Sequence, residues 1–574
     1  LKNGVDSKGQ RKSACIPKEV WEAHFKDVFT RGSERDGFTS GQLEVLKAYG
    51  RPERNEFDFP PTLEETLNAI KEAKGGKAPG PDGIQADLLK AGGDFVASEL
   101  CEIYNQVWPK VNTLECDIPK SWTKSRLVLL YKGKGVGGAK NPNNWRGINL
   151  LDTAGKVLSR IVANRLTSIS EEWLQDTQQG FRKGRSTANA IQVVKCLQHE
   201  ARMADRDSIA AFLDIRKAFD RVPRRAMLQA LKSIGVPRRM CKYIEKLHDE
   251  ACIVIDVGDN GRNEGLEIRC ERGVRQGCTL GPALFNVLLQ ACINIAENDL
   301  KSTPEGRKAL KGVVWDKSAP NGLITSSQND YESGGVAHLE FADDMVIVAE
   351  KWEYLVLWIE ALDNVLRPLG IEISGEKSKL MVLNASKGLR RMTDLKSKKM
   401  WVDGVALEWV SSFSYLGCVI SEDGGLEKEI TNRIARARRN FNRIAPIWRS
   451  KDLSKNLKMA TYSGVVVPAL LYGAETWNSS VRDVERIRAF QLSCSRIILG
   501  WDKLEHHTRK EIRKEVPLMA PLVNISTRRV RFALKISGMS SSAIVKRATL
   551  ARFTARRGTS RISGRSKQQW GLRL

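Results

Sequence analysis

The sequence predicts an α+β protein, in which an antiparallel sheet carries acidic side chains and a basic, helical region follows it. The run His338-Leu-Glu-Phe-Ala-Asp-Asp-Met-Val-Ile-Val348 sets two adjacent aspartates between short β-prone segments. This pattern predicts a hairpin with Asp343 and Asp344 at its tip. Within residues 430–444, apolar side chains recur at intervals of three and four, which predicts an amphipathic helix.

The acidic pair indicates a cation site only if another strand supplies a third carboxylate. Adjacent like charges repel, so such a pair is tolerated best where a cation neutralises both, and Mg²⁺ prefers oxygen ligands. Taken alone, the pair is better explained as a solvated Asp-Asp turn. Upstream, the β-prone run 208–215 carries Asp214 near its end, and residues 272–289 between the acidic segments read as a glycine-rich loop opening a long apolar helix.

This order of motifs resembles the palm of a reverse transcriptase, specifically the non-LTR retrotransposon (LINE) group and, within it, the RTE-like clade. Further blocks follow in the family's order over roughly residues 60–540. They are Lys77-Ala-Pro-Gly-Pro-Asp-Gly-Ile84, Asn144-Trp-Arg-Gly-Ile-Asn-Leu-Leu151, Gln179-Gly-Phe-Arg-Lys-Gly-Arg-Ser-Thr187, Gly370-Ile-Glu-Ile-Ser-Gly-Glu-Lys-Ser378, Phe413-Ser-Tyr-Leu-Gly417 and Leu470-Leu-Tyr-Gly-Ala-Glu-Thr-Trp477. The last block is typical of the retrotransposon thumb.

The resemblance implies a right-hand polymerase fold, with fingers, an antiparallel palm sheet and a helical thumb. The expected organisation is an N-terminal extension over 1–60, fingers with part of the palm over 61–205, the palm over 206–384, a connection over 385–424, a basic thumb over 425–538 and a basic, mobile tail over 539–574. A polar stretch rich in Gly, Ser and Asn predicts a long loop or ribbon inserted at 302–335.

By resemblance, Asp214 and Asp343 are ligands of two Mg²⁺ ions, for which Mn²⁺ can substitute, and Asp344 is the third acid of the set. These ions would serve the attack of a primer 3′-hydroxyl on a nucleoside triphosphate. The resemblance makes Asp220 a structural acid. Phe219 stands where the family has an aromatic residue that clashes with a 2′-hydroxyl, although packing at a helix start would also explain it.

Other residues match the family's nucleotide-binding positions. Gln276 and Gly277 fall in the loop that faces the incoming nucleotide, where glycine allows close approach of the backbone to a ligand. Arg146 and Lys132 match the basic residues that grip the triphosphate, and Lys134 competes for the second role.

Three further basic residues are assigned by resemblance. Lys377 stands where a lysine protonates the leaving pyrophosphate, and Lys379 competes with it. Arg182 and Arg185 are expected to contact the template backbone.

The charge balance indicates a polyanionic partner. The formal net charge is +26, and residues 425–574 hold 32 Lys and Arg against 10 Asp and Glu. No apolar run of about 18 residues could span a bilayer, so nucleic acid rather than a membrane is expected. Arg433, Arg436 and Arg439 lie mostly off the apolar stripe, which favours phosphate contacts, while a solvated basic face remains an alternative.

Two helices are expected before the palm, one over 20–29 that packs on the fingers and one opened by Thr62 and Glu65 as a capping box. The eleven cysteines occur singly, without zinc-ligand spacing, which indicates reduced thiols and an intracellular protein. The resemblance implies assembly with the element RNA in the cytoplasm and integration in the nucleus.

The sequence departs from the family in places, with Gly147 where many members have proline and Cys278 where many have aspartate. About 60 residues precede the fingers, too few for the family's endonuclease, so a fragment or degraded copy is expected. The implied reaction is target-primed reverse transcription, with template RNA, a DNA primer and dNTPs as partners; the sequence leaves the oligomeric state open.

Three rival functions are considered. A group II intron maturase would share the palm, but the block at 470–477 argues against it. A viral RNA-dependent RNA polymerase would usually show Gly-Asp-Asp and lack the aromatic residue at 219. A catalytically inactive RNA- or DNA-binding relic could keep the acids.

Overall fold

The protein is described by a computed structural model of the 574-residue chain. The residues described are 16–30, 35–133, 138–203, 208–256, 265–314, 335–383, 389–501, 507–516, 521–540 and 542–550. The chain divides into two compact units. Unit 1 comprises Leu1–Lys183, Ile215–Gly306 and Trp358–Ser374, and unit 2 comprises Gly184–Asp214, Arg307–Leu357 and Gly375–Leu574.

Unit 1 combines a four-stranded sheet with many helices. Its strands are β1 (Lys124–Tyr131), β2 (Trp145–Leu150), β4 (Cys252–Asp256) and β5 (Gly265–Arg269), in the order β2-β1-β4-β5. Its helices are α1 (Lys18–Thr30), α2 (Ser40–Ala48), α3 (Leu63–Glu72), α4 (Ala86–Ala91), α5 (Gly93–Val107), α6 (Lys120–Thr123), α7 (Thr153–Glu171), α9 (Arg224–Ser233), α10 (Arg238–Asp249) and α11 (Gly281–Lys301), with short turns η3 (Asn55–Phe57), η4 (Gly138–Lys140), η5 (Pro142–Asn144) and η6 (Arg367–Leu369). Helices α12 (Pro304–Ala309) and α13 (Trp352–Leu366) have residues in both units.

Helix α1 confirms the amphipathic segment expected near the N-terminus. Its apolar face carries Trp21 and Phe25, which join the strand residues Trp145 and Ile253 in one buried cluster. The rings of Trp21 and Trp145 meet edge to face at 6.0 Å between centroids. The helix therefore covers the sheet that carries β2.

Helix α3 begins with the capping box expected at Thr62. The Thr62 hydroxyl accepts from the backbone N–H of Glu65, and the Glu65 carboxylate accepts from the N–H of Thr62. That carboxylate also binds the buried guanidinium of Arg165 on α7 at 2.6 Å. The cap thus ties α3 to α7 as well as closing the helix end.

A buried histidine of α10 makes unit 1 sensitive to acid. His248 is hydrogen-bonded through Nδ1 to the carbonyl of Ile244 at 2.8 Å, and burial, aided by the Arg224 and Arg275 charges, lowers its pKa to about 3. In the unfolded chain the imidazole has its ordinary pKa near 6.5. The folded state therefore takes up its proton only near pH 3, and its stability falls as pH drops from about 6.5 toward 3.

We expect the free energy of unfolding to fall by up to about 1.4 kcal/mol per pH unit for this group below pH 6. A His248→Asn variant keeps a hydrogen-bond donor and removes the titration, so its unfolding free energy should fall less steeply with acid. Urea unfolding of both proteins at pH 7, 6, 5 and 4 measures the two slopes. Parallel slopes would contradict the assignment.

Unit 2 is built around a five-stranded sheet. Its strands are β3 (Ile209–Asp214), β8 (His338–Phe341), β9 (Asp344–Ala349), β10 (Lys379–Val382) and β13 (Glu408–Trp409), in the order β13-β10-β3-β9-β8. The two-stranded ribbons are β6 (Val313–Val314) with β7 (Gly335–Val336), β11 (Trp401–Val402) with β12 (Val405–Ala406), and β14 (Ser412–Tyr415) with β15 (Cys418–Ser421). Strands β3, β9 and β8 are antiparallel neighbours, as the sequence predicts for the acidic segments.

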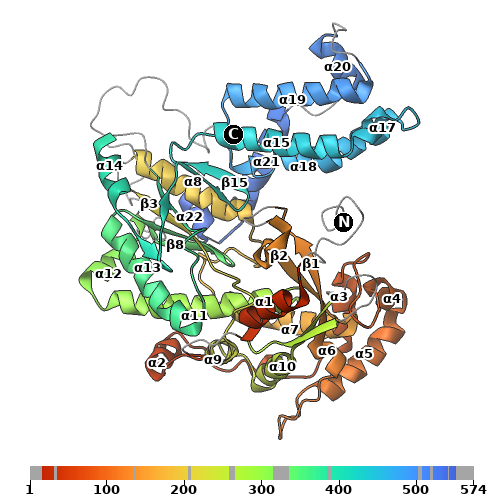
Figure 1. The fold of residues 1–574 in the computed structure, drawn as a ribbon, viewed down its shortest axis with the longest axis vertical. Helices are drawn as coiled ribbons and strands as arrows, with labels where there is room; N and C mark the ends of the chain where they lie inside the picture. Colours follow the sequence, from red (N-terminus) through yellow and green to blue (C-terminus); the bar gives the residue numbers. More distant parts are fainter. Residues whose placement is uncertain are drawn as a thin grey trace. The chain divides into compact units, whose positions relative to one another are not determined.

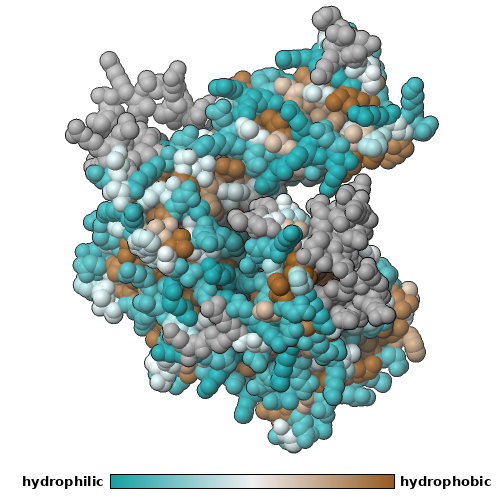
Figure 2. Space-filling view, in the orientation of Figure 1, coloured by the Kyte–Doolittle hydropathy of each residue, from teal (hydrophilic) through white to brown (hydrophobic). Residues whose placement is uncertain are grey.

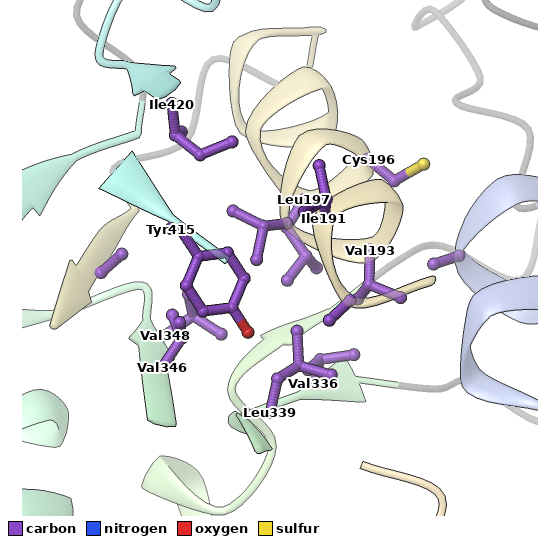
Figure 3. Close-up of a cluster of buried hydrophobic side chains, with 14 of the residues drawn as sticks. Ile191, Val193, Cys196, Leu197, Val336, Leu339, Val346, Val348, Tyr415 and Ile420 are labelled. Carbon is purple, nitrogen blue, oxygen red and sulfur yellow. The ribbon is translucent and has the colours of Figure 1, made fainter. Parts of the chain in front are cut away.

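One face of this sheet packs on α8 (Thr187–Met203). Alternate residues of β3, β8 and β9, among them Phe212, Leu339 and Val346, join Ile191 and Leu197 of α8 in a buried cluster. Figure 3 shows Leu339 and Val346 of the sheet facing Ile191 and Leu197 of α8, with Tyr415 of β14 among them. Because side chains of a strand alternate between faces, the face that carries Phe212 also carries Asp214 at the strand's end.

The rest of unit 2 is helical. Its helices are α14 (Leu389–Ser397), α15 (Glu427–Arg443), α16 (Ala445–Arg449), α17 (Lys455–Thr461), α18 (Val467–Leu470), α19 (Val481–Leu499), α20 (Arg509–Glu515), α21 (Pro521–Ser537) and α22 (Ile544–Leu550), with η7 (Tyr462–Val466) and η8 (Ala474–Thr476). Helices α18 and α19 both lie against α15 (Figure 1). The three helices share a buried core that includes Ile430, Phe441 and Ile487, which confirms the predicted apolar stripe. Figure 2 shows hydrophilic side chains and apolar patches mixed over α15 and α19.

Some sequence expectations change at the edges of unit 2. The expected insertion 302–335 contains α12 and the strand β6, and β6 pairs with β7, which begins at residue 335; residues 315–334 lie outside the described residues. The tail expected to be mobile begins instead with α22, whose Val545 and Ala548 are buried against α8 because the sequence supplies apolar residues at helical spacing there. Residues 551–574 are not among those described.

None of the helices among the described residues has the length and hydrophobicity of a membrane span. The predicted subdomain boundaries remain predictions.

Candidate active site

The acidic hairpin lies in unit 2 beside the strand that ends in Asp214. Phe341 and Asp344 are cross-strand partners, so Ala342 and Asp343 form a two-residue turn. Ala342 has φ of 58°, because the tight turns that suit such hairpins require a left-handed residue at this position. Asp343 is thereby held at the tip, next to the strand end that carries Asp344.

Strand pairing brings two of the three acids face to face. Asp214 and Asp344 are register partners on the adjacent antiparallel strands β3 and β9. Directly opposite residues point to the same face of a sheet, about 5 Å apart at Cβ. Two sequence segments separated by more than a hundred residues therefore supply carboxylates to one edge of the sheet.

The charges at this edge are strongly coupled. Loss of hydration by partial burial, together with the negative charges of Asp343 and Asp214, raises the pKa of Asp344 to about 6, and the Lys377 charge opposes the rise. The Lys377 ammonium lies 2.8 Å from Oδ2 of Asp214. A cation thus already stands at the acids, and the carboxylates still repel one another.

The donor set fits a hard divalent cation, since carboxylate oxygens are the ligands such ions prefer. Within the described residues, no three His, Cys, Asp or Glu side chains close around a common point as a ready-made metal cluster. The three aspartates instead supply carboxylate oxygens and an excess of negative charge at Asp214, Asp343 and Asp344. The Lys377 ammonium neutralises part of that charge.

This repulsion predicts a gain of stability on removal of one acid. In metal-free buffer at pH 7.5, we expect Asp344→Asn to raise the free energy of unfolding by about 1 kcal/mol, a value discounted for the solvent exposure of the side chain. Thermal unfolding with EDTA measures it. The matched control is Asp452→Asn, which removes an exposed carboxylate far along the chain and should leave stability unchanged. A loss of stability in Asp344→Asn alone would contradict the repulsion.

The geometry favours Lys377 over Lys379 at the acids. The Lys379 ammonium donates to the carbonyl of Glu376 at 2.6 Å and pairs with Glu408 at 3.2 Å. Lys377 is 63% exposed apart from its contact with Asp214. Of the two lysines, Lys377 is therefore the one whose ammonium lies at the acids.

Two residues near the acids were quoted in the sequence motifs without a role. The Ser378 hydroxyl, buried next to Lys377, accepts from the backbone N–H of Asp214 at 3.1 Å. Tyr415 is buried, and burial with the charges of Asp344 and Glu340 raises the pKa of its phenol well above the ordinary value. Ser378 thus fixes the end of β3, and Tyr415 is buried close enough to Asp344 to be affected by its charge. In the sequence, only their positions within the ordered motifs could have pointed to these two residues.

Apart from Lys377, the expected nucleotide-binding residues lie in unit 1. Arg146 is an exposed residue of β2, and the Lys132 ammonium donates to the carbonyl of Asn143 at 2.7 Å. Both cations act on Asp220: burial raises its carboxyl pKa to about 6, and the charges of Lys217, Arg146 and Lys132 oppose the rise. Asp220, expected to be structural, thus sits within the cationic cluster. Lys134 lies outside the described residues.

The glycine-rich loop is docked on β2. Asn149 donates its backbone N–H to the carbonyl of Gln276 at 2.8 Å. Gly277 has φ of 121°, and a Cβ there would lie 2.4 Å from the Asn149 carbonyl oxygen. Close approach to β2 by itself requires a glycine here, and the role of Gly277 toward a nucleotide stays a prediction.

Phe219 stands between two other aromatic rings of unit 1. Its centroid lies 5.0 Å from that of the buried Phe285 on α11 and 6.5 Å from that of Phe181. The backbone carbonyl of Phe219 accepts from Val274 at 2.8 Å, which ties it to the glycine-rich loop. The contact with Phe285 shows that the Phe219 ring takes part in packing. Its role toward the sugar of a nucleotide stays a prediction.

The position of Arg182 contradicts the expected template contact. Its buried guanidinium binds both oxygens of Glu171, at 3.0 and 2.8 Å, and the carbonyls of Gln175 and Gln178 at 2.6 and 3.0 Å. These bonds use its donors to fix the preceding loop. Arg185 lies in unit 2 and is partly exposed. Burial of Lys535 lowers the pKa of that lysine, and the positive charge of Arg185 lowers it further.

Arg433 also differs from its expected role. The guanidinium is buried, donates to Glu429 at 2.6 Å and to the carbonyl of Gly417, and stacks over the Tyr472 ring at 5.0 Å. It therefore holds α15 to the β14–β15 turn. Arg436 and Arg439 are exposed on the same helix, and their contact with nucleic acid stays a prediction.

Comparison with known proteins supplies the family. A model of the family "Reverse transcriptase (RNA-dependent DNA polymerase)" matches residues 134–420, half of the chain. The retrotransposable element R2 polyprotein of Popillia japonica is 26% identical over 426 residues, which cover 74% of this chain and 52% of that protein. The R2 polyprotein of Nasonia vitripennis is 26% identical, covering 76% and 38%.

A more distant relative is the RNA-directed DNA polymerase of the mobile element jockey from Drosophila melanogaster. It is 24% identical over 449 residues, covering 76% of this chain and 44% of that protein. The chain thus spans about half or less of these relatives. Among solved structures, apo telomerase of Candida tropicalis aligns with a TM-score of 0.34 and 11% identity, over 54% of this chain and 55% of that one.

The family match covers β3, the acidic hairpin, the glycine-rich loop and Lys377, and the relatives extend over most of the fold. The α+β architecture is the right-hand polymerase fold of that family. The RTE-like clade stays a prediction. The chain belongs to the reverse transcriptase (RNA-dependent DNA polymerase) family.

Proposed function

We propose that this chain is the polymerase part of a retrotransposon protein that copies template RNA by adding dNTPs to a DNA primer 3′-end. The observation that carries the proposal is the strand pairing of Asp214 with Asp344, with Asp343 at the adjoining turn. An acid cluster of this kind, in a member of the reverse transcriptase family, suits phosphoryl transfer, in which the protein chiefly positions groups and neutralises charge.

The three carboxylates would hold the divalent ions. Mg²⁺ bound there, with Mn²⁺ as a substitute, would lower the pKa of the primer hydroxyl and stabilise the leaving pyrophosphate. Asp214 lies at the end of β3, where its backbone N–H is bound by the Ser378 hydroxyl, and Asp344 lies opposite it on the neighbouring strand. The raised pKa of Asp344 supports the need for added positive charge.

Lys377 would serve as the proton donor to the leaving pyrophosphate. Its ammonium is held 2.8 Å from Asp214 and is otherwise open to solvent. From this position the ammonium can donate a proton to an oxygen of the departing group.

Unit 1 supplies the groups suited to the nucleotide. Arg146 and Lys132 would bind the triphosphate, since a guanidinium fork and an ammonium both match phosphate oxygens. Gln276 can donate and accept at once through its side chain, which suits a polar contact with the nucleotide. Phe219 would exclude a 2′-hydroxyl and so favour dNTPs.

In its natural setting the reaction would be target-primed reverse transcription in the nucleus, after assembly with the element RNA in the cytoplasm. The R2 relatives are named as Pol polyproteins of retrotransposable elements, which supports this setting. Exposed arginines of α15, including Arg436 and Arg439, would contact the nucleic acid backbone.

Primer extension tests the proposal. Purified protein is incubated with poly(rA)/oligo(dT), dTTP and Mg²⁺, beside an Asp343→Ala variant. We expect extension by the parent and its loss in the variant. No extension by a parent that still binds RNA would identify an inactive nucleic-acid-binding relic, and extension that survives Asp343→Ala would refute the site.

A further inference from the structure

Phe181 combines features that packing does not explain. It has φ of 56°, a left-handed conformation that is unusual for a bulky side chain. Its side chain is nevertheless 59% exposed, so burial of the ring does not compensate for the strained backbone. Strain of this kind persists only where the surroundings enforce it, and it gathers at binding and catalytic sites.

Buried polar side chains enforce this conformation from both sides. The Gln178 amide oxygen accepts from the backbone N–H of Gly180 at 2.8 Å, and Asn286 of α11 donates to the Gly180 carbonyl at 2.8 Å. On the other side, Arg182 is fixed by Glu171 and by two carbonyls. These hydrogen bonds fix the backbone on both sides of Phe181, and its ring faces solvent.

The presented ring meets Phe219. Phe181 and Phe219 approach edge to face, with an interplanar angle of 88°, while Phe285 supports Phe219 from the core. The next residue, Asp220, lies within the electrostatic reach of Arg146 and Lys132. An apolar pair of rings therefore adjoins a cluster of cations, a combination that matches a nucleoside triphosphate with its sugar beside its phosphates.

We propose that Phe181 is a second sugar-contacting residue: its ring bears on the deoxyribose of the incoming nucleotide and keeps the Phe219 ring in the orientation that rejects a 2′-hydroxyl. The inference rests on the proposed polymerase function. Two aromatic rings accept the C2′ methylene of a deoxyribose but offer a 2′-hydroxyl no hydrogen-bond partner. Loss of either ring opens space for that hydroxyl.

The test compares Phe181→Ala with the parent and with Phe95→Ala. Phe95, on α5 of the same unit, is 73% exposed and provides the same truncation away from Phe219. Extension of poly(rA)/oligo(dT) with dTTP or UTP gives kcat/KM for each nucleotide. A second readout, free of catalysis, is the apparent Kd of dTTP and UTP for the complex with dideoxy-terminated primer.

We expect Phe181→Ala to lower the preference for dTTP over UTP by about 2- to 10-fold in both readouts, the range that one edge-to-face aromatic contact supports. Phe95→Ala should keep the parental preference. Melting temperatures within about 2 °C of the parent would exclude a folding defect, as expected for an exposed side chain.

Two results would overturn the inference. One is an unchanged preference in Phe181→Ala. The other is weaker binding of the template–primer alone with the preference intact, which would assign the ring to a template base. A parent that binds dTTP in preference to UTP without extending the primer refutes the proposed function, while the Kd ratios still decide the role of Phe181.

Discussion

Replacement of Asp214 by Asn should lower the rate of dTTP incorporation by roughly 10³-fold or more, with little change in RNA binding. Asp214 is the acid most firmly fixed by the fold. It ends the central strand β3, pairs in register with Asp344, and receives the Lys377 ammonium at 2.8 Å. The amide keeps the shape and removes the charge. Single-nucleotide incorporation and filter binding measure the two quantities.

Asp452→Asn is the matched control, because it removes an exposed carboxylate of the same unit outside the acidic edge. Its incorporation rate should equal that of the parent. If Asp214→Asn retained more than about a tenth of parental activity, the acids would not serve as the metal-binding set. Loss of RNA binding in parallel would instead indicate a folding defect.

Replacement of Arg433 by Ala should lower the free energy of unfolding by about 3 kcal/mol or more. The substitution leaves the Glu429 carboxylate, which is 0% exposed, without the guanidinium that neutralises it. The same carboxylate accepts from the backbone N–H of Val419 at 2.7 Å, so α15 and the β14–β15 turn would loosen together. Urea unfolding followed by circular dichroism measures the loss.

Two further variants separate this role from nucleic acid binding. In Glu429→Gln with Arg433→Met, the amide keeps the Val419 bond and neither member of the pair is left as an unpaired charge, so much of the lost stability should return. Arg439→Ala should leave stability unchanged and weaken RNA binding in a salt-dependent way. Equal stability of Arg433→Ala and Arg439→Ala would show that the buried pair contributes nothing.

The pattern of the sequence was sufficient for local structure. Alternation and turn chemistry located β3, β8 and β9, and the apolar stripe located α15. The capping box at Thr62 was read correctly because it depends on residues three apart. Ordered motifs located the acids and identified the family, since their spacing needs no knowledge of packing.

Burial of charged groups could not be read from the same pattern. Arg433 and Arg439 occupy one helix only six residues apart, yet one is enclosed by Glu429 and Tyr472 and the other faces solvent. Arg182, next to an exposed phenylalanine, turns inward to Glu171. A helix period or a motif assigns a residue type to a position but does not identify the partners that lie far away in sequence.

The sequence by itself determined the acids, the basic balance and the order of motifs, because each depends on residue type and spacing. Only the tertiary structure decided three relations. Asp214 is the cross-strand partner of Asp344, Gly277 lies too close to the Asn149 carbonyl for a side chain, and the exposed Phe181 ring contacts Phe219. These relations join residues distant in the chain. Strand register, close backbone approach and buried hydrogen bonds set them, and each exists only once the chain has folded.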